Sequence, residues 1–117
     1  MTRMSQPELL LALHLTELGV MFERQYAYVP GRGFRADFGL FLPGAAVVLV
    51  HIDGGVYNRR AHGSISGILA DIERQNLATL NGYLALRFTP QQVENGEAID
   101  LIQRLMEMSD AKGVLGK

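Results

Sequence analysis

The fold is decided by the stretch Ala45-Ala46-Val47-Val48-Leu49-Val50-His51-Ile52-Asp53-Gly54-Gly55. Its apolar run predicts a buried strand in the interior of a sheet. His51 and Asp53 follow at the end of that run, and because side chains alternate across a strand they share one face. The two glycines then end the strand. An imidazole and a carboxylate directed the same way at a strand end favour a metal site there.

Outward from this strand, the chain reads as helix, three strands, helix, strand, helix. The helices are expected over residues 7–18, 65–80 and 97–108, with a short helical turn over 90–93, and the strands over 22–29, 34–42, 45–52 and 83–88. Ser5 and Glu8 form a capping-box pattern for the first helix, and Gly19 ends it. Ile68, Leu69, Ile72 and Leu80 are apolar positions of the second long helix.

The spacing of these elements predicts an α/β fold. The first three strands are separated by short turns, which favours an antiparallel meander. The link from the third to the fourth strand is long enough for a parallel crossover. We therefore expect a mixed four-stranded sheet with helices on both faces, in one domain over residues 1–110, followed by a flexible tail over 111–117.

The composition sets the class of protein. The chain has 117 residues, 48% of them hydrophobic and 20% charged, with a net charge of −1 and no cysteine. The lack of cysteine excludes disulfides and thiolate metal sites. No stretch predicts a signal peptide or a membrane span, so we expect a cytoplasmic protein without a membrane partner.

The charges are unevenly distributed along the chain. Residues 24–87 contain seven arginines, whereas residues 94–110 are acidic with one arginine, Arg104. Arginine suits bidentate contact with phosphate. Arginines that decorate a solvated surface would give the same pattern, so charge alone leaves both interpretations open.

A second carboxylate is expected near the end of the buried strand. If the second and third strands pair around Pro43-Gly44, Asp37 faces the end that carries His51 and Asp53. Carboxylate oxygens suit Mg²⁺ or Mn²⁺, and the imidazole shifts the preference toward softer divalent ions. The alternative is that the aspartates cap turns at strand ends.

Several strings together carry a family resemblance. They are Arg35-Ala36-Asp37-Phe38, residues 48–57, Arg60-Ala61-His62, Asp71-Ile72-Glu73-Arg74-Gln75-Asn76 and residues 82–89. In order and spacing they resemble small phage and bacterial endonuclease-domain proteins of the PD-(D/E)XK superfamily. That pattern is similar to very-short-patch repair endonucleases and Holliday-junction resolvases. The resemblance implies a restriction-endonuclease-like fold with the order α-β-β-β-α-β-α.

The resemblance also implies a role for individual residues. Glu8, Asp37, His51 and Asp53 match the positions that hold the metal, with Glu8 acting through water. His62 matches a histidine that contacts the scissile phosphate or assists proton transfer, and Arg74 matches a position that would contact the phosphate. The candidate DNA contacts are Arg32, Arg35, Arg59, Arg60, Arg74 and Arg87, of which Arg74 and Arg87 match family positions; Arg59 and Arg60 are alternatively a solvated pair.

Two residues depart from the family pattern. His51 stands where the family has a glutamate ligand, which is expected to weaken Mg²⁺ binding because this ion prefers oxygen ligands. Arg74 stands where the family often has a lysine, and arginine cannot give up its proton. The site is then expected to use Mn²⁺ or another imidazole-tolerant ion, or to be impaired in catalysis.

Three functions follow as hypotheses. The first is a Mg²⁺- or Mn²⁺-dependent DNA endonuclease, structure-selective for junction or branched DNA, acting in DNA repair or in a phage-infected cell. The second is a catalytically inactive DNA-binding module, and the third a protein-interaction module on the same fold. Cutting both strands of a duplex or junction needs two sites, which favours a homodimer.

Overall fold

A computed structural model describes residues 3–53 and 65–112. Its elements are α1 (Gln6–Leu18), β1 (Met21–Ala27), β2 (Arg35–Phe41), β3 (Val48–Ile52), α3 (Ile65–Leu80), β4 (Leu84–Phe88), α4 (Pro90–Glu94) and α5 (Glu97–Lys112). Each expected element is present, with small shifts at its ends. The largest is in α5, which continues into the segment expected to be a tail; residues 113–117 of that tail lie outside the described residues. None of the described helices is long and apolar enough to cross a membrane.

The first helix begins and ends where its capping residues predict. The Glu8 backbone N–H donates to Ser5 Oγ at 3.3 Å, and the Ser5 N–H donates to Glu8 Oε1 at 2.9 Å. This reciprocal pair satisfies two N–H groups that the helix itself leaves unpaired. Gly19 takes the left-handed conformation, with φ 83°, and its N–H closes the last turn on Leu15. The capping box therefore fixes where Glu8 stands relative to the sheet.

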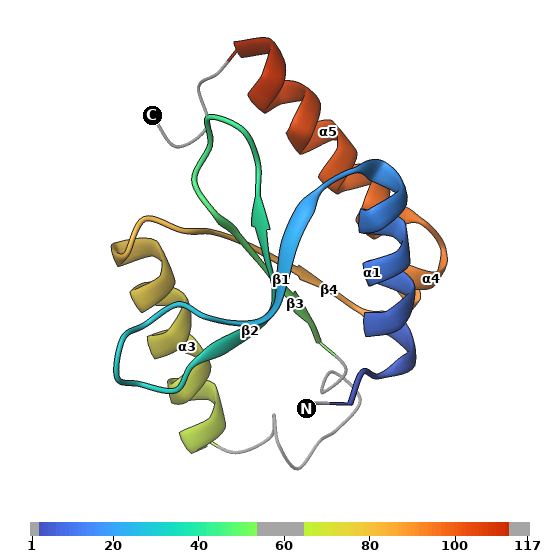
Figure 1. The fold of residues 1–117 in the computed structure, drawn as a ribbon. Helices are drawn as coiled ribbons and strands as arrows, with labels where there is room; N and C mark the ends of the chain where they lie inside the picture. Colours follow the sequence, from blue (N-terminus) through green and yellow to red (C-terminus); the bar gives the residue numbers. More distant parts are fainter. Residues whose placement is uncertain (1–2, 54–64, 113–117) are drawn as a thin grey trace.

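The four strands form one mixed sheet in the order β1-β2-β3-β4. β1 and β3 both pair antiparallel with β2, and β3 pairs parallel with β4. A parallel pair requires a crossover connection, and α3 lies within it (Figure 1). The predicted α/β class, meander and parallel crossover are confirmed, and β3 is an interior strand.

Helices lie on both faces of the sheet, but the two layers differ in size. α1, α4 and α5 lie together on one side and α3 on the other (Figure 1). The larger core fills the first side, where Phe38, Leu40 and Val50 are fully buried with Leu11 and Ile102 among their neighbours. The smaller core consists of Tyr28, Ala36, Leu49 and Ala78.

The α3 layer is unusual because the helix turns its apolar residues outward. Ile68, Leu69, Ile72 and Leu80 are 48%, 60%, 50% and 81% exposed, respectively. Ala78 is the one buried residue of this helix, and Ala70 and Leu77 are half-buried. The side that faces the sheet carries polar residues instead, and these line a cleft. The layer thus builds a polar site rather than a second full core.

Candidate functional site

Two carboxylates meet where α1 approaches the sheet. Glu8 is only 9% exposed, and its Oε2 accepts a hydrogen bond from Gln25 Nε2 at 3.3 Å. Asp37 Oδ2 accepts a hydrogen bond from the Ile52 backbone N–H at 2.7 Å. Burial raises the pKa of Asp37 above its usual value; the Ile52 N–H opposes this, whereas the Glu8 charge and a hydrogen bond between the two carboxyl groups add to it.

The end of a strand ladder explains the position of Asp37. The pairing of β2 with β3 runs from Leu40 opposite Val48 to Phe38 opposite Val50. Beyond that pair the Ile52 N–H is not used by a β2 carbonyl, so the Asp37 carboxylate accepts it instead. Gln25, in the adjacent part of β1, has a positive φ of 51°, which is uncommon outside glycine. The end of the β2–β3 pairing and the positive φ of Gln25 thus determine the surroundings of the Glu8–Asp37 pair.

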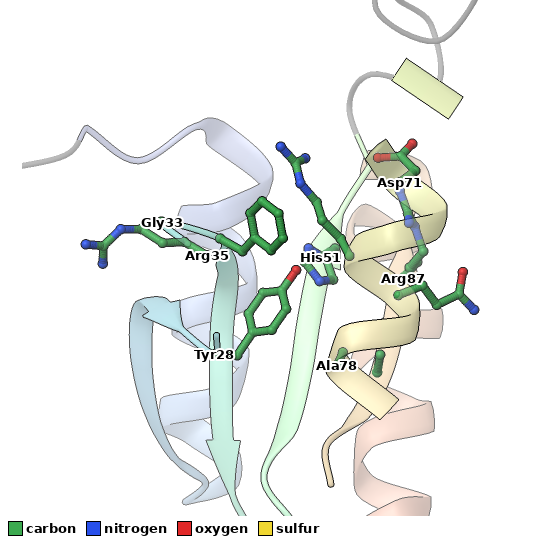
Figure 2. A pocket seen from close by; sticks show the side chains of 11 residues that line it. Tyr28, Gly33, Arg35, His51, Asp71, Ala78 and Arg87 are labelled. Carbon is green, nitrogen blue, oxygen red and sulfur yellow. The ribbon is translucent and has the colours of Figure 1, made fainter. Parts of the chain in front are cut away.

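A cleft of about 350 Å³ lies between α3 and the sheet. Its floor is formed by Tyr28, His51, Ala85 and Arg87 from the sheet side, and its walls by the segment 33–35 and by α3 (Figure 2). The α3 residues that line it are Asp71, Arg74, Gln75 and Ala78. Figure 2 shows the Tyr28 hydroxyl directed toward His51 at the centre of the cleft. Cavities of this size suit small ligands or one unit of a polymer.

His51 is a neutral imidazole at the floor of this cleft. Its ring meets the Tyr28 ring edge-on, with centroids 6.1 Å apart. Burial lowers the pKa of His51 below its ordinary value. The charges of Arg87 and Arg74 lower this pKa further, whereas those of Asp53 and Asp71 act in the opposite direction. At neutral pH the ring therefore carries no charge, and it can donate a hydrogen bond from one nitrogen and accept one at the other.

Arginines surround the cleft, and two of them lie against the ring of Phe34. The Arg74 guanidinium lies 5.0 Å from the centre of the Phe34 ring, and that of Arg32 lies 4.7 Å from it. Arg32 also pairs with Glu73 at 3.1 Å. Arg35 points away from the centre of the cleft in Figure 2, and its Nη1 donates to the Gln25 carbonyl at 3.0 Å. Arg74 is the one arginine of α3, and the other arginines come from the segment before β2, from the first residue of β2 and from β4.

Asp53 and Arg87 form an ion pair at the end of β3. Arg87 Nη2 lies 3.0 Å from Asp53 Oδ2, and Arg87 stands opposite His51 in the parallel ladder. Because the carboxylate is engaged by the guanidinium, Asp53 stabilises Arg87 beside the cleft. This partner competes with the predicted role of Asp53 as a metal ligand.

The predicted metal-binding residues are divided between two places. Glu8 and Asp37 meet, His51 lines the cleft, and Asp53 pairs with Arg87. Within residues 3–53 and 65–112 no group of three or more histidine, aspartate or glutamate side chains is placed to hold a metal ion. The structure thus brings two of the four together.

Some of the predicted phosphate and DNA contacts lie at the cleft, and the others lie outside the described residues. Arg35, Arg74 and Arg87 line the cleft, and Arg32 lies at its rim through Phe34. The remaining predicted contacts lie outside the described residues; they are Arg59, Arg60 and His62. Four of the six predicted DNA-contacting arginines therefore surround one cleft.

Three residues of the site carried no such role in the sequence analysis: Tyr28, Phe34 and Gln25. Tyr28 and Phe34 read as residues that pack within strands. Their position beside the Pro30-Gly31-Arg32-Gly33 turn was the available signal, since turns at strand ends commonly carry functional residues. Gln25 had no signal, because its positive φ and its contact with Glu8 depend on the tertiary structure.

The Glu8–Asp37 pair is suited to a divalent cation. Two carboxylates in contact with little solvent repel one another, and a hard cation between them would relieve that repulsion. The Gln25 side chain adds a polar neighbour. The donor set fits oxygen-preferring ions such as Mg²⁺ or Mn²⁺, with water completing the coordination.

Comparison with known proteins adds no relative: no family model, no curated protein and no solved structure matches this chain. The resemblance to PD-(D/E)XK nucleases therefore rests on the sequence strings alone.

Proposed function

We propose that this protein is a restriction-endonuclease-like DNA endonuclease that hydrolyses phosphodiester bonds with a divalent metal ion. One observation carries the proposal: Glu8 and Asp37 form a contacting pair of poorly solvated carboxylates, and Asp37 binds the Ile52 N–H next to His51, which lines a cleft with three arginines. Gln25 also connects the pair to the cleft, since its side chain binds Glu8 and its carbonyl accepts from Arg35. Carboxylates for a cation and cations for a phosphate are the two components that such hydrolysis needs.

Glu8 and Asp37 are the residues that would hold the metal. A bound Mg²⁺ or Mn²⁺ supplies charge that polarises a phosphoryl oxygen and lowers the pKa of a bound water. The capping box fixes Glu8, and the Ile52 N–H fixes the Asp37 carboxylate, so both side chains are held before a ligand arrives. Such preorganisation reduces the cost of gathering like charges around an ion.

The cleft would contact the DNA backbone. The Arg74 guanidinium would bind a phosphate. Arg87 is held at the floor of the cleft by its ion pair with Asp53. His51 is uncharged and serves as a hydrogen-bond donor or acceptor rather than as a counter-charge. We expect salt-dependent DNA binding with a modest slope, because few phosphates are reached by one small domain.

A second function is a non-catalytic DNA-binding module on the same fold. The Asp53–Arg87 ion pair favours it, because it occupies a carboxylate that the family resemblance assigns to the metal. The histidine at position 51 favours it as well. In this case the cleft would still bind phosphate, and the metal would have no effect on DNA.

The decisive experiment combines metal binding with cleavage. Melting temperatures are measured with and without Mg²⁺ and Mn²⁺, and a supercoiled plasmid and a four-way junction are offered as substrates. We expect Mn²⁺ to raise the melting temperature and to support cutting, and Asp37→Asn to remove both effects. Glu107→Gln, an exposed acid on α5, is the matched control and should change neither. DNA binding without cutting in either metal would leave the non-catalytic module.

The size of the domain bears on its assembly. Symmetric cutting of a junction needs two sites related by a twofold axis, so we propose a homodimer on such substrates. Sedimentation with and without a four-way junction measures this. A single copy bound per junction would contradict it.

A further inference from the structure

Three polar groups in the cleft lack hydrogen-bond partners. Among the described residues, no hydrogen bond reaches the Tyr28 hydroxyl or the His51 imidazole, and Arg74 has only its contact with the Phe34 ring. Tyr28 is 3% exposed and His51 is half-buried, and both side chains line the cleft. The polar atoms of these side chains are open to the cleft, so a ligand that accepts hydrogen bonds there would become their partner.

The charge around these groups selects an anion. Arg74 and Arg87 lie close enough to Tyr28 and His51 for their positive charges to act to lower the pKa of both side chains. Asp53 offsets the charge of Arg87, whereas Arg74 and Arg35 form no ion pair among the described residues. Arg35 points away from the centre of the cleft, so Arg74 is the cation available there (Figure 2). A guanidinium, a phenol and an imidazole are all suited to phosphoryl oxygens.

The walls of the cleft favour a strand end over a continuous strand. The Arg32–Glu73 ion pair joins the turn before β2 to α3. Arg32 also lies against Phe34, so the pair connects two walls of the cleft. A strand that passed through would need an exit between these walls, whereas a strand end needs one opening. The two guanidinium groups on Phe34 also occupy the ring that would otherwise stack on a base.

We propose that the cleft binds a terminal phosphate monoester of a nucleic-acid strand, held by the Tyr28 hydroxyl, the His51 imidazole and the Arg74 guanidinium. This inference rests on the proposed action on DNA and extends it to the class of substrate. Because Asp37 accepts from the Ile52 N–H and the adjacent His51 lines the cleft, a bound strand end would lie near the carboxylates. The preferred substrate would then be DNA with a phosphorylated end at a nick or flap.

The test measures binding without divalent metal, so that cleavage does not contribute. Single-stranded decanucleotides carrying a 5′-phosphate, a 3′-phosphate or only hydroxyl ends are compared by fluorescence anisotropy, with inorganic phosphate as competitor. One phosphorylated end should bind about tenfold tighter than the hydroxyl oligonucleotide, in keeping with a charge-assisted hydrogen-bond set. Tyr28→Phe and Arg74→Gln should each remove most of that preference. Arg104→Gln, an exposed residue on α5, should retain it.

The outcomes separate the two proposals. Equal binding of phosphorylated and hydroxyl ends, or a preference that survives in the Tyr28→Phe/Arg74→Gln double variant, would overturn the end-binding proposal. Competition by inorganic phosphate without any gain from an end phosphate would also overturn it. Covalently closed circular DNA has no end, so its metal-dependent cutting tests the proposed endonuclease alone.

Discussion

Adding one methyl group at Gly39 is expected to destabilise the layer of rings beneath the cleft. A Cβ built on Gly39 would lie 2.6 Å from Tyr26 Cγ and 3.0 Å from both Cβ and Cδ1 of the same side chain. Tyr26 cannot move freely, because its ring packs edge-on against Phe41 and Tyr83 and its hydroxyl lies 3.3 Å from that of Tyr83. The Gly39→Ala substitution must therefore shift a side chain held on several sides.

The magnitude follows from two opposing effects. Overpacking of this kind costs about 1–3 kcal/mol. Replacing a glycine at an ordinary φ recovers about 0.4–1 kcal/mol through the unfolded state. A net loss of about 1–2 kcal/mol corresponds to a fall of about 0.5–1 M in the urea midpoint for a domain of this size.

Equilibrium urea denaturation measures this loss, and a second background identifies its cause. In a Tyr26→Ala protein the closest clash is gone, so Gly39→Ala should cost only a fraction of its effect in the wild type. A Gly39→Ala protein as stable as the wild type would refute the reasoning. So would an equal loss in both backgrounds.

The remaining predictions concern the ionisable groups of the site. Asp37→Asn should raise the free energy of unfolding near neutral pH, because the raised pKa of Asp37 means that its charged form destabilises the fold. Chemical denaturation at about pH 7 and about pH 4 measures this gain, which should shrink at the lower pH as the wild-type carboxyl takes up a proton. The lowered pKa of His51 predicts that the stability of the wild type falls below about pH 6.5, because the histidine of the unfolded chain takes up a proton first. His51→Gln should flatten this decline, and a parallel decline in the two proteins would contradict the prediction. His51→Glu should increase Mg²⁺-dependent DNA cleavage at least about tenfold, or about 1.4 kcal/mol of barrier, and an unchanged rate would show that residue 51 is not a missing ligand.

Local features of the fold were predictable from the sequence because they depend on neighbours in the chain. Ser5 and Glu8 are three residues apart, which is the spacing a capping box requires, and Gly19 supplies the left-handed end. Gly44, with φ 67°, provides the turn between β2 and β3, where the Ala45 N–H donates to the Leu42 carbonyl. The apolar run before His51 likewise identified an interior strand.

The orientation of α3 was not predictable from its periodicity. The apolar stripe that includes Leu69 and Ile72 is regular, and such a stripe usually faces a core. In the structure this stripe faces outward, while Asp71 and Arg74 face the cleft. Periodicity shows that a helix has two unlike faces, but only packing against the sheet determines which face turns inward.

Sequence by itself determined which elements form and which chemical groups lie near the end of β3. Tertiary structure decided how those groups are shared: Asp37 with Glu8, His51 with Tyr28, and Asp53 with Arg87. The physical reason is that each partnership joins residues from different elements. It depends on where the β2–β3 ladder stops and on how β4 aligns with β3, and both are set by long-range pairing rather than by local sequence.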